Sequence, residues 1–307
     1  MTDAVVTTNL TKEYKTTVAV ARADIKIPAG TCCGFLGKNG AGKTSTIKML
    51  AGLLPPTDGK IEILGEERVY GKTFAPSFGY LPDVPNFYGY MKGAEFLELC
   101  GKLCHMPDSV LKPRIAELLA HVGLDGARSR ISGYSRGMKQ RLGIAQSMIN
   151  SPKLILMDEP ISALDPIGRR DVSEIIRKME DTTVILSTHI LADVEDICDY
   201  VLIIEKGKIL AHDYLSNLKE KYSSGAVKIR FYQKPDAEKF CQLRADWQAQ
   251  TDNANPLDII VKSETLDAKA LGQQIIQALS QSQIPCQKFG AHSPTLEDIF
   301  YEVTENA

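Results

Sequence analysis

The sequence predicts an α/β fold with a buried parallel sheet, a helical insertion and a small α+β domain at its C-terminal end. Short apolar runs alternate with helical patterns up to about residue 222, which is typical of α/β domains. A helical pattern interrupts them over about residues 86–150, and beyond residue 225 the residue pattern changes. A chain of 307 residues is also long for one average domain. We therefore expect one domain over residues 1–222 and a smaller one over 223–307.

Three apolar runs of the larger domain end abruptly in residues that are suited to binding or catalysis. They span residues 31–37, 154–159 and 182–189, and they end in glycine, acid and histidine respectively. In open α/β sheets, ligands bind in the crevice outside the carboxyl ends of the strands. These three ends are therefore expected to lie around one crevice.

The insertion and the tail have recognisable local patterns. The insertion opens with the aromatic stretch NFYGYM, and the tail contains two strand patterns, AVKIRFY and LDIIV. LDAKALGQQIIQALSQSQ is patterned as an amphipathic helix. PTLEDIFYEV predicts a last helix, because Thr295 and Asp298 have the spacing of a capping box.

GKNGAGKT, residues 37–44, fits the phosphate-loop pattern GxxxxGK[ST] and lies between a strand and a helix. Glycines let a backbone wrap closely around phosphate oxygens, and the N-terminus of the following helix attracts them. Lys43 would neutralise the β- and γ-phosphates, Thr44 would bind magnesium, and Ser45 would add a hydroxyl nearby. The alternative, a glycine-rich turn without a ligand, is disfavoured by the flanking strand and helix.

LILMDE supplies two adjacent carboxylates at the end of a buried strand. Side chains alternate along a strand, so Asp158 and Glu159 can divide the work. Asp158 would hold the magnesium shell, and Glu159 would polarise the attacking water. The alternative is an acidic pair that caps the turn before Pro160. His189 follows the third strand, where a contact with the γ-phosphate is favoured over a purely structural role.

The stretch YSRGMKQRL, residues 134–142, predicts the start of a helix. Ser135 is a good N-cap, and Met138, Leu142, Ala145 and Ile149 form an apolar stripe. A helix start exposes unpaired N–H groups and partial positive charge, which makes an anion site. The alternative for this motif alone is a solvated basic face on a core helix.

The order of phosphate loop, YSRGM, LILMDEP, SALD and STH resembles the ATP-binding cassette (ABC) ATPases, phosphate-loop NTPases with a helical subdomain, over about residues 1–222. The resemblance implies ATP and Mg2+ as cofactors. It implies catalytic roles for Glu159, His189 and Lys43, and magnesium ligands at Thr44, Asp158 and Asp83. The implied nucleotide-binding residues are Tyr14, Gly37, Lys38, Asn39, Gly40, Ala41, Gly42, Lys43, Thr44, Ser45, Ser135, Gly137 and Asp165.

The sequence also departs from the family pattern. GYLPD puts Asp83 where a glutamine is usual, and YSRGM has Arg136 and Met138 where the family usually has glycine and glutamine. Ser135 and Gly137, the signature residues that contact phosphate in the family, are both present.

The resemblance extends to partners. PTLEDIF and GYLPD are similar to motifs in the ATPase subunits of ABC-2-type exporters. In that family ATP holds two cassettes head to tail, here most simply a homodimer, and drives a separate membrane-spanning permease. The resemblance therefore implies a cytoplasmic, peripheral protein on the inner face of the cell membrane, with the permease docked against the helical insertion and the groove near residues 83–91. The alternative for NFYGYM in this segment is ordinary core.

Composition excludes several other classes. With 36 basic and 38 acidic side chains, no nucleic-acid partner is expected. The seven cysteines show no CxxC spacing, which argues against a zinc site or disulfide framework and fits a reducing cytosol. No uncharged apolar run reaches the roughly 18 residues that a membrane helix needs.

Two alternative functions remain open at this stage. A soluble ABC-fold ATPase acting on ribosomes or DNA would usually carry two cassettes or long coiled arms. In a small-molecule kinase, YSRGM and SALD would have no purpose.

Overall fold

The computed structural model describes residues 2–71, 78–162, 164–223, 225–244, 247–252, 255–263 and 266–305. The chain divides into two compact units, one of Met1–Leu215 with Phe300–Ala307 and one of Ser216–Ile299. The domain limits given above, 1–222 and 223–307, remain predictions. Each unit is described by itself.

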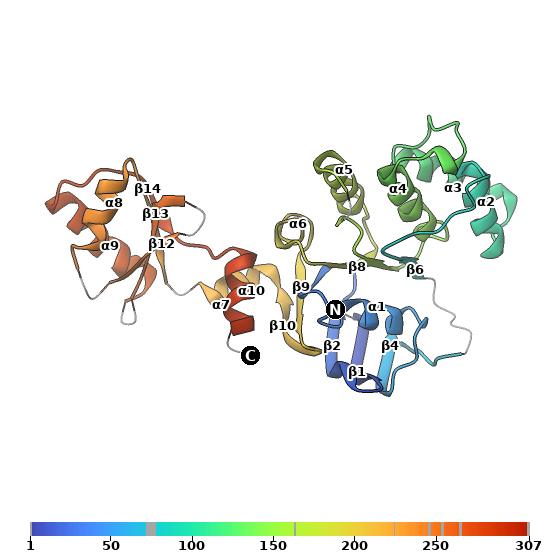
Figure 1. Cartoon of the computed structure of the whole chain (residues 1–307), viewed down its shortest axis with the longest axis horizontal. Coiled ribbons are helices and arrows are strands. Elements are labelled where there is room, and N and C mark those ends of the chain that lie inside the picture. Colours follow the sequence, from blue (N-terminus) through green and yellow to red (C-terminus); the bar gives the residue numbers. More distant parts are fainter. Residues whose placement is uncertain are drawn as a thin grey trace. The chain divides into compact units, whose positions relative to one another are not determined.

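The first unit begins with an antiparallel sheet (Figure 1). Its strands, in spatial order, are β2 (Thr17–Pro28), β1 (Asp3–Tyr14), β4 (Asp58–Ile63) and β5 (Glu66–Glu67). The sequence does not predict this sheet as distinct from the parallel one. Asn9 and Arg22 have positive φ angles, and the register of β1 shifts along its length, so the apolar alternation that marks a half-buried strand is interrupted.

A second sheet of six strands carries the predicted site. Five of its strands are parallel, as predicted, and β10 pairs with β9 in the antiparallel direction. Its spatial order is β10 (Lys208–Tyr214), β9 (Tyr200–Glu205), β3 (Cys32–Leu36), β8 (Thr183–Thr188), β7 (Leu154–Asp158) and β6 (Phe78–Leu81). Since β3, β8 and β7 are neighbours, their carboxyl ends lie side by side at one edge.

Helices cover both faces of the parallel sheet. Helix α1 (Lys43–Leu50) packs between the two sheets and contributes Ile47, Met49 and Leu50 to their shared hydrophobic core. On the opposite face lie α5 (Pro166–Arg177) and α6 (Leu191–Ile197) (Figure 1).

The helical insertion consists of three α-helices and a short 3-10 turn. These are α2 (Gly93–Leu103), α3 (Asp108–His121), η1 (Ile131–Gly133) and α4 (Arg136–Ser147). Ser135 caps α4 as predicted, because its hydroxyl oxygen accepts a hydrogen bond from the Met138 N–H at 3.2 Å. Buried Leu142, Ile144 and Ala145 hold the helix against the rest of the unit.

The second unit has the βαββαβ order of ferredoxin-like domains. Its elements are β11 (Val227–Phe231), α8 (Lys234–Cys241), β12 (Gln248–Asp252), β13 (Asn255–Lys262), α9 (Ala268–Gln281) and β14 (Cys286–Ala291). The antiparallel strands lie in the order β12-β13-β11-β14. Helices α8 and α9 bury Phe240 and Ile275 against Ile229 and Val261 of the sheet. This agrees with the predicted α+β class.

The remaining helices among the described residues are α7 (Leu215–Tyr222) and α10 (Leu296–Glu305). The predicted capping box precedes α10: Thr295 and Asp298 each accept a hydrogen bond from the other's backbone N–H, at 3.2 and 2.8 Å. In the part of the chain that the structure describes, no helix combines the length and apolar character needed to cross a membrane.

Candidate nucleotide site

The loop after β3 has the backbone shape of a phosphate cradle. Gly40 and Gly42 have φ angles of 81° and 115°, which L side chains rarely adopt. A Cβ on Gly42 would also lie 2.4 Å from the carbonyl oxygen of Ala19. Gly42 is the N-cap of α1, so the free N–H groups of this helix start face the inside of the loop.

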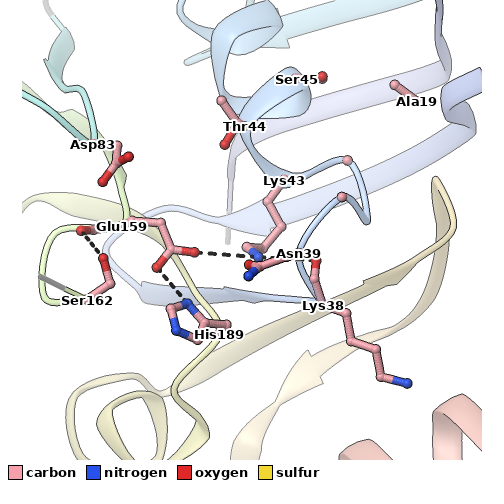
Figure 2. A pocket seen from close by; sticks show the side chains of 12 residues that line it. Ala19, Lys38, Asn39, Lys43, Thr44, Ser45, Asp83, Glu159, Ser162 and His189 are labelled. Carbon is pink, nitrogen blue, oxygen red and sulfur yellow. Dashed lines mark hydrogen bonds and ion pairs between the residues drawn. The ribbon is translucent and has the colours of Figure 1, made fainter.

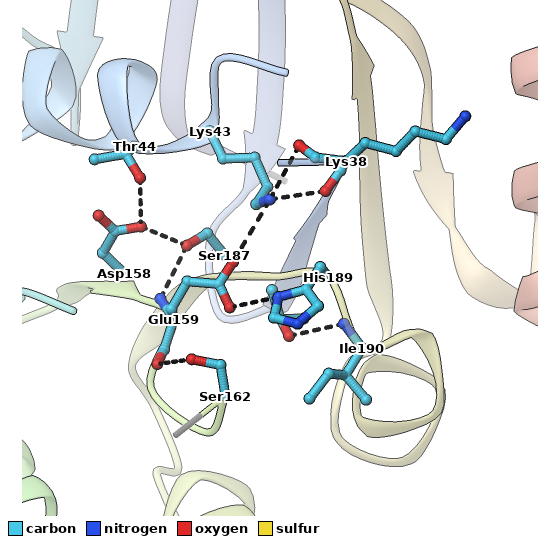
Figure 3. Close-up of polar contacts among 11 residues, drawn as sticks. Lys38, Lys43, Thr44, Asp158, Glu159, Ser162, Ser187, His189 and Ile190 are labelled. Atoms are coloured by element: carbon cyan, nitrogen blue, oxygen red, sulfur yellow. Dashed lines mark hydrogen bonds and ion pairs between the residues drawn. The ribbon is translucent and has the colours of Figure 1, made fainter. Parts of the chain in front are cut away.

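Lys43 lies in the middle of this cradle. Its side chain is 6% exposed, and its Nζ donates hydrogen bonds to the carbonyl oxygens of Gly37 at 2.7 Å and Lys38 at 3.4 Å. The Nζ also lies 3.5 Å from Oε1 of Glu159 (Figure 3). A buried ammonium group is thus compensated by oxygens in the loop and by one carboxylate.

Asp158 lies at the end of β7 and is 2% exposed. Its Oδ1 accepts hydrogen bonds from Thr44 Oγ1 at 3.2 Å and Ser187 Oγ at 2.7 Å (Figure 3). The sheet register explains the second contact, because Asp158 and Ser187 are paired residues of β7 and β8. The loop helix and the acidic strand are therefore joined through this carboxylate.

Glu159 turns away from the strand that carries Asp158. Its φ is 50°, and its N–H donates to both the hydroxyl and the carbonyl oxygen of Ser187, at 3.0 and 3.2 Å. Its Oε2 lies 3.0 Å from Nδ1 of His189. A left-handed backbone at a non-glycine residue is unfavourable by about 1–2 kcal/mol, so these contacts must hold it.

Lys43, Glu159 and His189 line a cavity of about 400 Å³ (Figure 2). Figure 2 shows the Glu159 carboxylate facing Lys43 and His189, whereas the amino group of Lys38 points away from them. The cavity is lined by Ala19, Lys38, Asn39, Gly40, Gly42, Lys43, Thr44, Ser45, Asp83, Glu159, Ser162 and His189.

Comparisons with known proteins decide the family. The model of the ABC transporter family matches residues 20–162. The uncharacterized ABC transporter ATP-binding protein YxlF of Bacillus subtilis (strain 168) is 35% identical over 297 residues, which cover 96% of this chain and 97% of YxlF. The chain belongs to the ATP-binding proteins of ABC transporters.

Two further relatives agree with this assignment. The daunorubicin/doxorubicin resistance ATP-binding protein DrrA of Streptomyces peucetius is 31% identical over 310 residues, covering 99% of this chain and 93% of DrrA. A solved ATP-binding subunit of an ABC transporter superposes with a TM-score of 0.64 at 28% identity, covering 71% of this chain and 93% of that one. The resemblance and the fold class inferred from the sequence are confirmed.

Family membership also gives the general activity. ABC ATP-binding proteins are ATPases that power transport and work with membrane permease components, so this chain is an ATP-binding ATPase of that kind. The individual roles of the site residues stay predictions, which the geometry of this ABC protein can support or weaken.

Not all predicted residues line the cavity. Gly37 and Ala41 support the loop from behind: a Cβ on Gly37 would lie 2.5 Å from the Ile204 carbonyl oxygen, and Ala41 is buried. The hydroxyl of Tyr14, at the end of β1, lies 3.4 Å from Ser45 Oγ, which places the half-exposed ring beside the cavity.

The signature residues and Asp165 of SALD do not line the cavity, whereas Ser162 of the same motif does. Ser135, Gly137 and Asp165 are not among the described residues that line this chain's own cavity. Ser135 caps α4, and Asp165 caps α5 by accepting a hydrogen bond from the Gly168 N–H at 3.0 Å. Ala163, inside the SALD motif, lies outside the described residues.

The oxygens of Thr44 and Asp158 suit a hard cation. Mg2+ prefers oxygen ligands and usually takes few from the protein, since phosphates and water supply the rest. Among the described residues, no group of three His, Cys, Asp or Glu side chains is arranged to hold a metal. A magnesium ion shared with phosphates fits this donor set better than a site built from protein ligands alone.

Carboxylates also set the electrostatics beside the cavity. Burial and the charges of Asp158 and Asp83 raise the pKa of Tyr80 to about 12, so its phenol stays protonated at neutral pH. The negative charges of Asp158 and Asp83 therefore both act on the phenol of Tyr80.

Ser187 is a site residue that sequence analysis missed. It is fully buried and contacts both acidic residues. A signal for it exists in the sequence: a serine inside a wholly buried apolar strand needs a hydrogen-bond partner, and the nearest strand end carries the two acids.

Proposed function

We propose that this chain binds ATP with Mg2+ in the cavity, hydrolyses it with Glu159 as general base, and thereby powers a separate membrane permease for export. The observation that carries the proposal is the position of the Glu159 carboxylate at the opening of the phosphate loop, between Lys43 and His189. A general base must lie within hydrogen-bond reach of the water that it deprotonates.

Binding of ATP would rearrange the contacts of Lys43. The γ-phosphate carries more negative charge than the Gly37 carbonyl, so Lys43 would turn from this oxygen and from Glu159 toward the phosphates. The released carboxylate can then accept a proton from water, while His189 keeps it oriented through the 3.0 Å contact.

The cation would be held by Thr44 and Asp158, with Asp83 as a further ligand. Mg2+, when bound, neutralises phosphate charge and stabilises the charge that develops in transfer. The buried hydrogen bonds of Asp158 keep its carboxylate in place for this role.

A second cassette, in the simplest case another copy of this chain, would complete the site. The capped start of α4 at Ser135 and Gly137 offers an anion site that does not face this chain's own cavity. In a head-to-tail pair, that helix start would cover the γ-phosphate bound by the partner.

Export rests on the relatives. DrrA is named for daunorubicin/doxorubicin resistance, and resistance to a toxic compound fits its removal from the cell. The similarity to transporter proteins disfavours the alternative of action on ribosomes or DNA. We place the chain at the inner face of the membrane, where a permease would meet it near residues 83–91.

Co-purification tests this proposal. The tagged chain, isolated in mild detergent from the cell that encodes it, is expected to retain a multi-helix membrane protein in stoichiometric amount. When both are reconstituted in vesicles, solute should move, in an ATP-dependent way, away from the side of the membrane that carries the ATP-binding chain. Association with ribosomes or DNA, without any membrane protein, would contradict the proposal.

A further inference from the structure

Two cysteine thiols lie close together at the amino-terminal end of β3, the opposite end of this strand from the phosphate loop. Sγ of Cys32, at the start of β3, lies 3.5 Å from Sγ of Cys198, the residue that follows α6. The backbone keeps them together, because the Cys32 N–H donates to the Asp199 carboxylate at 2.8 Å and the Asp199 N–H donates to the Cys32 carbonyl at 3.1 Å. The thiol contact is therefore a fixed feature of the fold.

The pair combines an accessible thiol with a buried one. Cys32 is partly exposed, whereas Cys198 is 6% exposed, and burial raises the pKa of the Cys198 thiol. Both line a cavity of about 300 Å³, into which Arg177 and Asp199 also project. Redox-sensitive cysteines are typically accessible and placed beside a second, resolving cysteine. Neighbouring Cys33 instead belongs to the main hydrophobic core.

We propose that Cys32 and Cys198 form a reversible regulatory disulfide in response to hydrogen peroxide. The Cys32 sulfur, as thiolate, attacks one peroxide oxygen, and the O–O bond breaks. Cys32 becomes a sulfenic acid, and the departing hydroxide takes up the proton that the Cys32 thiol had lost and leaves as water. The Cys198 sulfur then attacks the Cys32 sulfur, the S–S bond forms, and the hydroxyl leaves as a second water after taking up the Cys198 proton. Two thiols thus lose two electrons in total, and one hydrogen peroxide becomes two waters.

Closing this bond would act on α6. An S–S bond is about 2.05 Å long, so the sulfurs must approach one another from 3.5 Å. Helix α6 has little freedom to slide, since a Cβ on Gly34 of β3 would lie 2.3 Å from Cγ1 of Val194. The middle of α6 is fixed against β3, so a pull on Cys198 at the C-terminal end of the helix tilts it. His189 lies just before the N-terminal end of the same helix.

The consequence for activity rests on the proposed role of His189. The 3.0 Å contact between His189 and Glu159 lengthens when α6 tilts, so oxidation lowers the hydrolysis rate. Bond formation itself depends only on the thiol geometry. Thiol–disulfide exchange with a dithiol reductant reverses it.

Peptide mapping of the oxidised full chain tests the bond. Cys100→Ser and Cys104→Ser are introduced first, because these two thiols lie one turn apart at the end of α2: Cys100 is in its last turn and Cys104 is its C-cap. After hydrogen peroxide, non-reducing mass spectrometry is expected to show one cross-link between Cys32 and Cys198, with fragmentation to distinguish Cys32 from Cys33. Dithiothreitol should remove it. Oxidation of the remaining thiols while Cys32 and Cys198 both stay reduced would overturn the proposal.

Two variants separate the bond from its effect. In Cys198→Ser, no cross-link should form, and a cyclic 1,3-dione should trap Cys32 as its sulfenic acid. Cys241→Ser, which alters another partly buried thiol, should still cross-link. The oxidised parent should lose ATPase activity and regain it on reduction, whereas oxidised Cys198→Ser should not respond. A cross-linked protein with unchanged kcat would overturn the regulatory effect, and an inactive reduced protein would instead count against the proposed function.

Discussion

At the scale of single residues, the carboxylate of Glu159 contacts a cation on one side and an imidazole on the other. Lys43 Nζ lies 3.5 Å from Oε1, and His189 Nδ1 lies 3.0 Å from Oε2. In the proposed mechanism, the same carboxylate would serve two states: it would balance the charge of Lys43 before phosphates bind, and it would accept a proton from water afterwards. His189 contacts the carboxylate in the first state and is placed to orient it in the second.

Replacing this carboxylate by an amide should separate binding from hydrolysis. Glu159→Gln is expected to slow hydrolysis by about 10²-fold or more, the usual scale for losing a positioned base. ATP binding should persist, because the phosphate loop is untouched. Phosphate release and titration calorimetry measure the two quantities, with Glu66→Gln on exposed β5 as control. Unchanged turnover in Glu159→Gln would remove this residue from the mechanism.

Ser187 is expected to position both acids. Ser187→Ala leaves the Glu159 N–H and the Asp158 carboxylate without one partner each, and an unsatisfied buried group is unfavourable by about 1–3 kcal/mol. We expect kcat to fall and the Mg2+ concentration needed for half activity to rise, with ATP affinity nearly unchanged.

Two variants control for a purely structural effect at Ser187. Ser187→Thr keeps the hydroxyl and should restore the Mg2+ dependence. Ser147→Ala removes another buried hydroxyl, which donates to Ile144 at 2.8 Å in α4, and should alter stability alone. If both alanine variants change the Mg2+ dependence equally, the positioning role is wrong.

At the scale of elements, the contact between β3 and α6 depends on the absence of a side chain. A Cβ on Gly34 would lie 2.3 Å from Cγ1 of Val194, closer than real contacts allow. Gly34→Ala should lower the free energy of unfolding by about 1–3 kcal/mol, as overpacking does. Urea unfolding measures this change, with Gly126→Ala, which meets no atom within 4 Å, as the matched control. Equal stability of both variants would contradict the tight packing of α6.

In the second unit, β11 and β13 share an ion-pair network on the face away from their apolar core. Asp258 is 1% exposed, and it accepts hydrogen bonds from Arg230 at 2.5 and 2.7 Å and lies 3.0 Å from Lys228 Nζ. The hydrogen bonds from Arg230, assisted by Lys228, lower the pKa of Asp258 to about 2. The folded state therefore favours the ionised carboxylate.

This shift predicts an acid dependence of stability. The pKa of Asp258 is lower in the folded chain than in the unfolded one, so its contribution is full above the unfolded value of about 3.9 and is lost as pH falls through about 2. The contribution is on the order of 2 kcal/mol. Denaturant unfolding between pH 6 and roughly 2 should show a smaller loss in Asp258→Asn than in the parent. An identical loss in both would contradict the network.

Sequence patterns predicted those features of the structure that depend on interactions between residues close together in the chain. The caps at Ser135 and Thr295, and the phosphate loop before α1, depend on residues a few positions apart, and the structure confirms their local geometry. The pairing of Asp158 with Ser187 depends on the register between β7 and β8, which the sequence does not state. The antiparallel sheet of β1 and the strand order of the second unit are likewise set by long-range packing. The positive φ of Glu159 follows from its contacts with Ser187.

At the scale of the whole molecule, we propose that each chain contributes one half to each of two nucleotide sites. The cavity is lined by the phosphate loop, Asp83, Glu159 and His189, whereas Ser135 at the start of α4 is not among its lining residues. A functional site would then need two chains, and ATP would hold them together until hydrolysis releases them. This release would convert chemistry into movement of a permease.

The mass of the chain in solution, measured by light scattering on Glu159→Gln with saturating Mg2+ and ATP, tests this account most directly. We expect a dimer with ATP and a monomer without it, because ATP persists when hydrolysis is slow. Adding Ser135→Arg should abolish the dimer while calorimetry still shows ATP binding. A Glu159→Gln protein that binds ATP but remains monomeric, both alone and beside its permease, would contradict the account.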